Sequence, residues 1–393
     1  MAINTIRAQR KCPICDESRV QILYTFSMFL PEAIPLAGDY AVVSCSKCGF
    51  VYQDSRATLL DYENYYTYFN KYGAAPTITE ETLELFGHYK GIFDAVVKKD
   101  ARILDVGCAG GILLDFLKES GYNKVAGLDP SEDCVKKMSD RGIESYLGSI
   151  YSVNPAIPGK SFDLIILSGV MEHLFDVQKA VQTLDRYLED SGKIFIGVPD
   201  AARYGDYFNS FSYYFNFEHI NHFSNTSLNN LMLKFKYVNV RTDYHDISFG
   251  DSIVPVFSAV YQKNGVRPAS FTKDMLSFQS ASHYFQFYTY KLEDIVNRVN
   301  ELLGTQEEIV IWGAGNVSIE LLSRTNLRKC NIQAFVDKDP GKQGKTLAGK
   351  KICPPEILRS FNGTIVICAA VYAADILSEI KSMGLKNKTL VLK

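Results

Sequence analysis

The residues best suited to chemistry are concentrated in a short aromatic segment, NFEHINHFS, which runs from Asn216 to Ser224. It holds two of the six histidines of the chain, His219 and His222, beside Glu218. Histidine titrates near neutral pH, and a neighbouring carboxylate raises its basicity. We therefore predict that His219 is a general base assisted by Glu218. His222 is a further candidate for a catalytic role and Asn216 for a hydrogen bond to the substrate, and the simpler alternative is a loop with two surface imidazoles.

A third histidine, His173, follows Glu172 just after the apolar run FDLIILS. That run reads as a buried strand, and ligands of open α/β sheets bind at the carboxyl ends of the strands. The segment 216–224 follows the next predicted strand, so both histidine segments should reach the same sheet edge. We predict that His173 assists His219 by orientation or charge, although such a histidine can also serve only to position a loop.

Four of the nine cysteines form two C-x2-C pairs, CPIC at 12–15 and CSKC at 45–48. Each pair aims two thiolates at one point, and two pairs complete a tetrahedral zinc site with no open position. A zinc ion there would be structural rather than catalytic. The predicted ligands are Cys12, Cys15, Cys45 and Cys48, whereas the other five cysteines are scattered and read as buried small side chains.

A glycine-rich turn separates a predicted strand from a predicted helix in ILDVGCAGGILLDFL. Glycines there let the backbone turn sharply and approach a ligand. Asp105 ends the strand, Gly107 and Gly111 lie in the turn, and Asp129 ends the next strand. An acid at that second position can accept hydrogen bonds from a ribose diol.

These details resemble the class I S-adenosylmethionine (SAM) methyltransferases, whose first motif is D-x-G-x-G-x-G. The resemblance covers residues 86–263, with Ala109 at the middle glycine. It implies that Asp129 holds the ribose, Ser149 lies near the adenine and Ser168 lies beside the methionine part. The leading acid suits a cationic cofactor better than a pyrophosphate, so an NAD-dependent oxidoreductase ranks last.

Alternating strand and helix patterns predict an α/β protein with a mostly parallel central sheet. The predicted parts are a zinc-binding module at 1–55, a Rossmann-like SAM domain at 56–264, a connecting helix within 265–305 and a Rossmann-like C-terminal domain at 306–393. Two further strands within 237–263 are expected to form an antiparallel edge. The tyrosines of YENYYTYFNKYG, at 62–73, could cover a domain seam or form the wall of a polar pocket.

The order of these parts resembles the nucleotide-sugar C-methyltransferases of deoxysugar pathways. The resemblance implies a nucleotide-bound 4-keto sugar as substrate, with a base removing the proton beside the ketone before methyl transfer. The family's stretch Y-H-E-H-x-x-Y-F-S keeps Glu218 and His219 here, but it departs at Asn216, Phe217 and His222. The loss of a phenol at Asn216 removes one possible proton donor.

The C-terminal domain carries a second glycine turn, Gly313 and Gly315, with Asp337 at the end of the next strand. The pattern is that of a dinucleotide site with Ser318 in place of its third glycine. Resemblance to the same family implies that this domain holds the nucleotide of the substrate. Trp312 replaces a family tyrosine and no lysine lies in the loop, so a purely structural domain is the alternative.

The composition of the chain limits the kinds of partner that we expect it to bind. The formal net charge is −2 and no cluster of basic residues stands out, so binding to nucleic acid is not expected. The chain shows no signal-peptide pattern and no apolar run of membrane-spanning length, and we expect a cytoplasmic protein with a small-molecule substrate. Sugar O- or N-methylation, RNA methylation and a non-catalytic sensor of SAM or nucleotide-sugar remain as alternatives.

Overall fold

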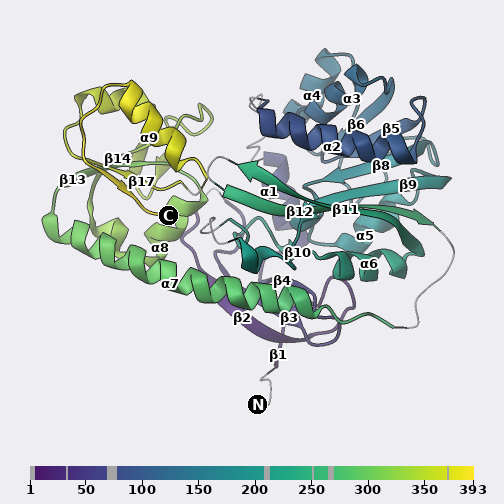
Figure 1. Cartoon of the computed structure of the whole chain (residues 1–393), viewed down its shortest axis with the longest axis horizontal. Coiled ribbons are helices and arrows are strands. Elements are labelled where there is room, and N and C mark those ends of the chain that lie inside the picture. The colour runs from purple at the N-terminus through teal and green to yellow at the C-terminus, as the bar shows by residue number, and fades with distance from the viewer. Residues whose placement is uncertain are drawn as a thin grey trace.

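The computed structural model describes residues 5–31, 34–68, 78–207, 213–249, 252–263, 270–369 and 371–393. Their strands form three separate sheets, with one long helix running past two of them (Figure 1). This is the three-part α/β architecture that the sequence predicts. Within the described residues, no helix combines the length and the apolar character needed to cross a lipid bilayer.

The N-terminal sheet is antiparallel throughout. Four of its strands come from the cysteine-bearing segment, and the fifth comes from the histidine segment more than 150 residues later. In sheet order they are β1 (Ile6–Arg7), β2 (Arg19–Ser27), β3 (Asp39–Cys45), β4 (Val51–Ser55) and β10 (Asn221–His222). The segment predicted to carry the chemistry is therefore anchored on the cysteine module.

The central sheet has seven strands, of which five are parallel and two are antiparallel. In sheet order they are β11 (Tyr237–Phe249), β12 (Ser252–Lys263), β9 (Leu188–Pro199), β8 (Phe162–Ser168), β5 (Arg102–Val106), β6 (Lys124–Asp129) and β7 (Glu144–Leu147). The predicted antiparallel edge is thus confirmed, with β11 outermost. The predicted boundary at 264/265 lies outside the described residues.

Helices cover both faces of this sheet, because its parallel strands are apolar on both sides. One face carries α2 (Glu80–Val96), α3 (Ile112–Glu119) and α4 (Glu132–Asp140), and the other carries α5 (Val177–Leu184) and α6 (Asn225–Lys234) (Figure 1). Successive residues of β5 show the division: Ile103 packs with the first group and Leu104 with the second. The loops that follow β5, β6 and β8 all emerge at one edge.

The C-terminal sheet is parallel except for one short edge strand. Its strands, in sheet order, are β15 (Thr346–Leu347), β16 (Lys350–Cys353), β14 (Asn331–Val336), β13 (Glu308–Trp312), β17 (Thr364–Ile367) and β18 (Thr389–Val391). Its helices are α8 (Asn316–Arg324) and α9 (Ala373–Ser382), with 3-10 turns at Asn326–Lys329 and Pro355–Ser360.

The long helix α7 (Met275–Thr305) connects the N-terminal sheet to this domain (Figure 1). Its 31 residues span about 46 Å at 1.5 Å per residue. Phe285 stacks on Tyr24 of β2 with ring centroids 4.7 Å apart, while Val299 and Leu302 are buried farther along. The helix therefore fastens the first and third sheets to one another.

Candidate functional site

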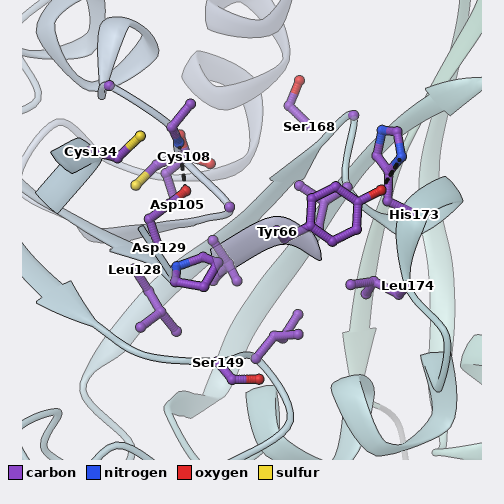
Figure 2. Close-up of a pocket in the computed structure, with 18 of the residues that line it drawn as sticks. Tyr66, Asp105, Cys108, Leu128, Asp129, Cys134, Ser149, Ser168, His173 and Leu174 are labelled. Atoms are coloured by element: carbon purple, nitrogen blue, oxygen red, sulfur yellow. Dashed lines mark hydrogen bonds between the residues drawn. The ribbon is translucent and has the colours of Figure 1, made fainter. Parts of the chain in front are cut away.

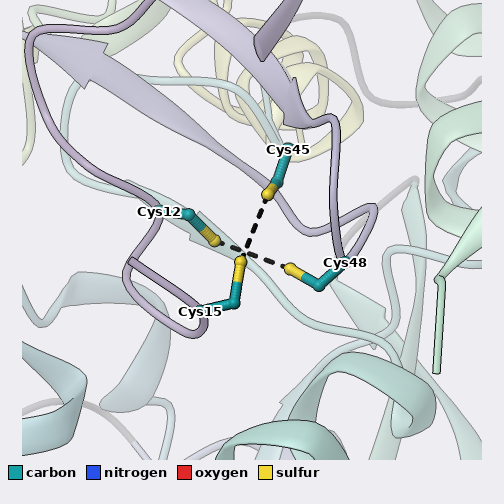
Figure 3. A group of neighbouring side chains, drawn as sticks. All are labelled: Cys12, Cys15, Cys45 and Cys48. Carbon is teal, nitrogen blue, oxygen red and sulfur yellow. Dashed lines mark hydrogen bonds between the residues drawn. The ribbon is translucent and has the colours of Figure 1, made fainter. Parts of the chain in front are cut away.

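Two side-chain clusters stand out, and the first is the cysteine group (Figure 3). The four sulfur atoms lie within 4.8 Å of one another, with Cys12 Sγ 3.6 Å from Cys48 Sγ and Cys15 Sγ 3.4 Å from Cys45 Sγ. All four side chains are buried. Sulfur atoms at the corners of a zinc tetrahedron lie about 3.8 Å apart, given Zn–S bonds of about 2.3 Å. The predicted cysteines thus meet in a group that could hold a metal ion.

The second cluster lies where β5, β6 and β8 end. The turn after β5 has the left-handed backbone that glycines allow: Gly107 has φ +70° and Ala109 has φ +49°. A Cβ at Gly107 would lie 2.8 Å from Cγ2 of Val170. Asp129, at the end of β6, holds this turn by accepting hydrogen bonds from Ala109 N and Ser131 N, both at 2.9 Å.

These loops enclose a cavity of about 480 Å³ (Figure 2). Seven of the predicted site residues line it, namely Asp105, Gly107, Ala109, Asp129, Ser149, Ser168 and His173. Gly111 does not line it. That residue caps α3 with φ +76°, where a Cβ would lie 2.6 Å from Met138 Cγ.

The described residues that line the cavity include four carboxylic acids and no lysine or arginine. Burial, with the nearby charge of Asp129, raises the pKa of Asp105 to about 8. Burial raises the pKa of Asp129 to about 6, although hydrogen bonds from Ser131 and Ala109 oppose the shift. The described residues offer these two acids no cationic partner. SAM carries an ammonium and a sulfonium and would supply such a cationic partner, so the acidic lining of the cavity fits this cofactor.

Helix α1 (Leu59–Tyr68) carries tyrosines for which the sequence allowed two interpretations, a domain seam or the wall of a polar pocket. Its residues Tyr62, Glu63 and Tyr66 line the cavity, as the pocket-wall interpretation requires. Ser149 Oγ donates to Glu63 Oε1 at 2.7 Å, so a predicted cofactor residue is held by an acid that the motifs did not single out. Tyr72 of the same tyrosine-rich segment lies outside the described residues.

His173 ends a 3-10 turn (Met171–His173) on the cavity wall. Its Nδ1 lies 3.0 Å from the main-chain oxygen of Glu218 and 3.0 Å from the hydroxyl of Tyr66 (Figure 2). Because a carbonyl oxygen only accepts, Nδ1 must carry the proton in that bond, which leaves the lone pair of the neutral ring on Nε2. The arrangement makes Nε2 the basic atom.

His219 lies against His173, with ring centroids 4.9 Å apart in an edge-on contact. It is half-buried and does not line the cavity itself. Asn216 accepts hydrogen bonds from the main-chain nitrogens of Glu218 and His219 at 2.9 and 3.1 Å, and its Nδ2 donates to Tyr213 O. The polar atoms of Asn216 thus hold the histidine segment in place.

Glu218 is buried, and its carboxylate binds groups from two other parts of the chain. Tyr65 Oη donates to Oε1 at 2.7 Å, and Asn316 Nδ2, from the C-terminal domain, donates to Oε2 at 3.3 Å. Glu218 therefore links α1, the histidine pair and α8.

His222 is placed elsewhere. It is 1% exposed in β10, its ring packs on Phe215 at 4.3 Å, and neither ring nitrogen has a hydrogen-bond partner among the described residues. Burial lowers its pKa to about 3. A catalytic role for His222 stays a prediction that this aromatic surrounding does not favour.

Arg10 supports both histidine segments, and no motif pointed to it. Its buried guanidinium donates to Leu174 O at 3.4 Å and Phe175 O at 2.5 Å, just after His173. It also donates to Ile220 O at 3.2 Å and Asn221 Oδ1 at 3.1 Å, just after His219. A lone arginine in a short N-terminal segment carries no sequence signal for such contacts.

The glycine turn of the C-terminal domain resembles that of the methyltransferase domain. In both, a glycine has a positive φ, and an aspartate at the end of the next strand accepts a hydrogen bond from a main-chain nitrogen of the turn. Gly313 has φ +109°, where a Cβ would lie 2.5 Å from Cys368 O, and Asp337 Oδ2 accepts from Ala314 N at 2.9 Å. Lys342 Nζ binds the same Asp337 oxygen at 3.0 Å. A ribose diol at Asp337 would have to displace or share this lysine.

Comparison with known proteins supports the central assignment. Residues 80–242 match the family described as "Methyltransferase domain", and residues 305–391 match one described as "C2185-like, N-terminal". The ubiquinone biosynthesis O-methyltransferase of Rhizobium etli is 30% identical over 101 residues, which are 25% of this chain and 40% of that protein. The corresponding enzyme of Xanthomonas oryzae pv. oryzae is 32% identical over 103 residues, 25% of this chain and 43% of its own.

The chain thus matches less than half the length of these curated relatives. Among solved structures, a SAM-dependent methyltransferase from Methanosarcina mazei has 16% identity and a TM-score of 0.37, covering 45% of this chain and 98% of its own. One from Aquifex aeolicus has 17% identity and a TM-score of 0.37, covering 47% and 93%. Likeness at this level says nothing about what the chain acts on.

The family match spans the strands and turns that enclose the acid-lined cavity. The chain therefore contains a class I SAM-dependent methyltransferase domain, which follows a four-cysteine cluster and precedes a separate C-terminal α/β domain.

Proposed function

We propose that the whole protein is a SAM-dependent methyltransferase that acts on a nucleotide-activated keto sugar and transfers the methyl group to carbon. The observation that carries this proposal is the histidine pair beside the cavity. His173 lies on the cavity wall, and His219, which does not line the cavity, lies in ring contact with it. A base placed in this way can act on an acceptor that approaches the donor from outside.

Bound SAM supplies an electrophilic methyl group on a sulfonium. The protein must supply a nucleophilic carbon, which requires removal of the proton from the carbon beside the ketone. We assign this step to His219, since a base contacts the acceptor rather than the donor. The imidazole of His219 would take this proton, and the resulting enolate carbon would be the nucleophile for the methyl group that the bound cofactor supplies. Such base assistance contributes about 10²- to 10⁴-fold.

His173 and Glu218 would act by orientation. Glu218 precedes His219 in the chain, and its carboxylate is held by Tyr65 and Asn316. An ionised Glu218 would favour the imidazolium that forms when His219 accepts the proton. His173, held at Nδ1 by Glu218 O, would set the position of the His219 ring and of the acceptor.

The diphosphate of such an acceptor would lie outside the cavity, because the ionised carboxylates among the acids that line it would repel phosphate. The neighbouring segment of the C-terminal domain is cationic, with lysines at 338, 342, 345, 350 and 351. Lys345, Lys350 and Lys351 are exposed, and the described residues offer them no acidic partner. These side chains suit phosphate as a ligand.

We propose zinc as the ion of the cysteine group, with Cys12, Cys15, Cys45 and Cys48 as its ligands. The all-sulfur set and the burial of all four ligands support it. A closed four-thiolate site has no open position for a substrate, so the ion would stabilise the N-terminal sheet.

The proposal is tested with a nucleotide-activated 4-keto sugar that carries deuterium on the carbon beside the ketone. C-methylation must remove that deuterium, and mass spectrometry of the product would show a methyl group gained and the label lost. A control incubation without SAM measures exchange with solvent. A methylated product that keeps the label would exclude methyl transfer to that carbon.

O-methylation is the second candidate, because the curated relatives named above are O-methyltransferases of ubiquinone biosynthesis. His219 could remove a hydroxyl proton by the same geometry. Retained deuterium in a methylated sugar would favour this reaction.

A further inference from the structure

The C-terminal domain contributes one residue, Asp339, to the wall of the methyltransferase cavity. Every other described lining residue lies between Tyr62 and Leu174. Asp339 belongs to the loop after β14, more than 160 residues farther along the chain. The Asn316–Glu218 hydrogen bond is a second contact between this domain and the site. The third domain therefore reaches the methyltransferase site at two points.

The loop around Asp339 is held by its own hydrogen bonds. Gly341 N donates to Asp339 Oδ1 at 2.9 Å, and Asp339 N donates to Asp337 Oδ1 at 3.0 Å. Lys342 N also donates to Asp339 O at 3.0 Å. These bonds fix the side chain through one carboxylate oxygen, and none of them neutralises its charge.

The lysines near Asp339 bind other acids. Lys342 Nζ pairs with Asp337 at 3.0 Å, and Lys338 Nζ pairs with Glu379 at 2.7 Å. Within the described part of the chain, Asp339 takes part in no ion pair. It therefore brings an uncompensated negative charge to a cavity that already holds Glu63, Asp105 and Asp129.

A fourth acid in such a cavity is unfavourable unless the ligand is a cation. We propose that Asp339 is a SAM-binding residue, through which the C-terminal domain takes part in recognition of the cofactor. This inference depends on the SAM site of the methyltransferase domain and not on the identity of the acceptor. The charge of Asp339 would also favour binding of SAM over S-adenosylhomocysteine, the product of methyl transfer, because that product has lost the sulfonium charge.

The test compares Asp339→Asn with wild type by isothermal titration calorimetry. Asparagine keeps the oxygen that accepts from Gly341 N, so the variant removes charge while keeping the turn. We expect SAM to bind about tenfold more weakly, S-adenosylhomocysteine to lose less, and methylthioadenosine, which lacks the sulfonium and the amino-acid group, to change less than about twofold. Asp375→Asn, an exposed acid in the first turn of α9, is the matched control and should leave all three affinities unchanged.

Three outcomes overturn the inference. Unchanged SAM affinity in Asp339→Asn would exclude contact with the cofactor, and equal losses for SAM and methylthioadenosine would indicate a structural effect. Wild-type protein that fails to bind SAM would refute the inference together with the cofactor assignment. A selective loss of SAM affinity, in a protein that methylates no keto sugar, would uphold this role while refuting the proposed acceptor.

Discussion

At the scale of single residues, Gly107 is the position where the backbone conformation and the nearby Val170 leave no room for a side chain beside the cofactor. Its φ is +70°, and a side chain there would bring its Cβ within 2.8 Å of Val170, so the position has no room for one. We predict that Gly107→Ala weakens SAM binding more than about tenfold, because the turn must shift to relieve a strain of about 1–3 kcal/mol. Calorimetric titration with SAM measures the effect.

Gly87→Ala is the control for this prediction. A Cβ at Gly87 would have no atom within 4 Å, its φ is not positive, and this residue of α2 is not among those that line the cavity. This variant should bind SAM within about twofold of wild type. Equal losses in the two variants would mean that a general effect of replacing glycine, and not the close approach to Val170, governs the site.

His222 makes a prediction about pH. Its pKa is about 3 when folded and about 6.5 when unfolded, so the unfolded chain binds the extra proton between these values. Stability is therefore lost as pH falls below about 6.5, by about 2 kcal/mol between pH 7 and pH 5. Phenylalanine fits the same aromatic surrounding without titrating. His222→Phe should thus lose less stability between pH 7 and pH 5 than wild type does.

Denaturant unfolding at the two pH values measures this difference. Identical acid sensitivity in the two proteins would show that His222 is not buried as a neutral ring.

At the scale of elements, the cysteine turns show that two short sequence patterns can predict a cluster of four side chains. We predict about one zinc ion per chain and its loss in Cys12→Ser, since removal of one thiolate opens a four-ligand site. Loss of the ion should lower the thermal midpoint, because β2, β3 and β4 then lack their common anchor. Elemental analysis and thermal unfolding report both effects. Cys353→Ser, which alters a half-buried cysteine outside the group, should keep the ion.

Metal-free protein with an unchanged thermal midpoint would contradict the structural role of the ion.

The elements that could be predicted are those specified by neighbours in sequence. The strand–turn–helix from Arg102 to Glu119, the cysteine turns and the long helix α7 each carry a local pattern, and each is present. Ala109 even adopts the left-handed φ that the missing glycine would have favoured. What could not be predicted depends on long-range packing. Examples are the pairing of β10 with β4, the Glu63–Ser149 bond and the contacts of Arg10.

At the scale of the whole molecule, the parts hold one another in place through buried polar contacts. Arg324 of α8 lies over the rings of Tyr24, Phe26 and Tyr288 at 5.0 to 5.5 Å, and it donates to Tyr24 Oη at 2.6 Å. Arg10 holds the two histidine segments together by donating hydrogen bonds to main-chain oxygens of both. Arg324 thus joins the first and third parts, while Arg10 and Asn316 connect each of these parts to the histidine segments of the site.

Arg10→Met tests this dependence. It removes five hydrogen bonds, four to main-chain oxygens and one to Asn221 Oδ1, which should lower the free energy of unfolding by about 3 kcal/mol or more. Turnover should fall as His173 and His219 lose their fixed spacing. Arg19→Met, at an exposed arginine paired with Glu17, should stay within about 0.5 kcal/mol of wild type. Equal stability of the two variants would contradict the supporting role of Arg10.

The most direct test of the proposed function is transfer of a labelled methyl group from SAM to a panel of nucleotide-activated 4-keto sugars, with His219→Ala beside wild type. We predict transfer by wild type to at least one sugar, and turnover about 10²- to 10⁴-fold lower in the variant with SAM affinity nearly unchanged. Full turnover in His219→Ala would contradict the assignment of the base. Tight SAM binding by wild type without transfer to any sugar would contradict the proposed function.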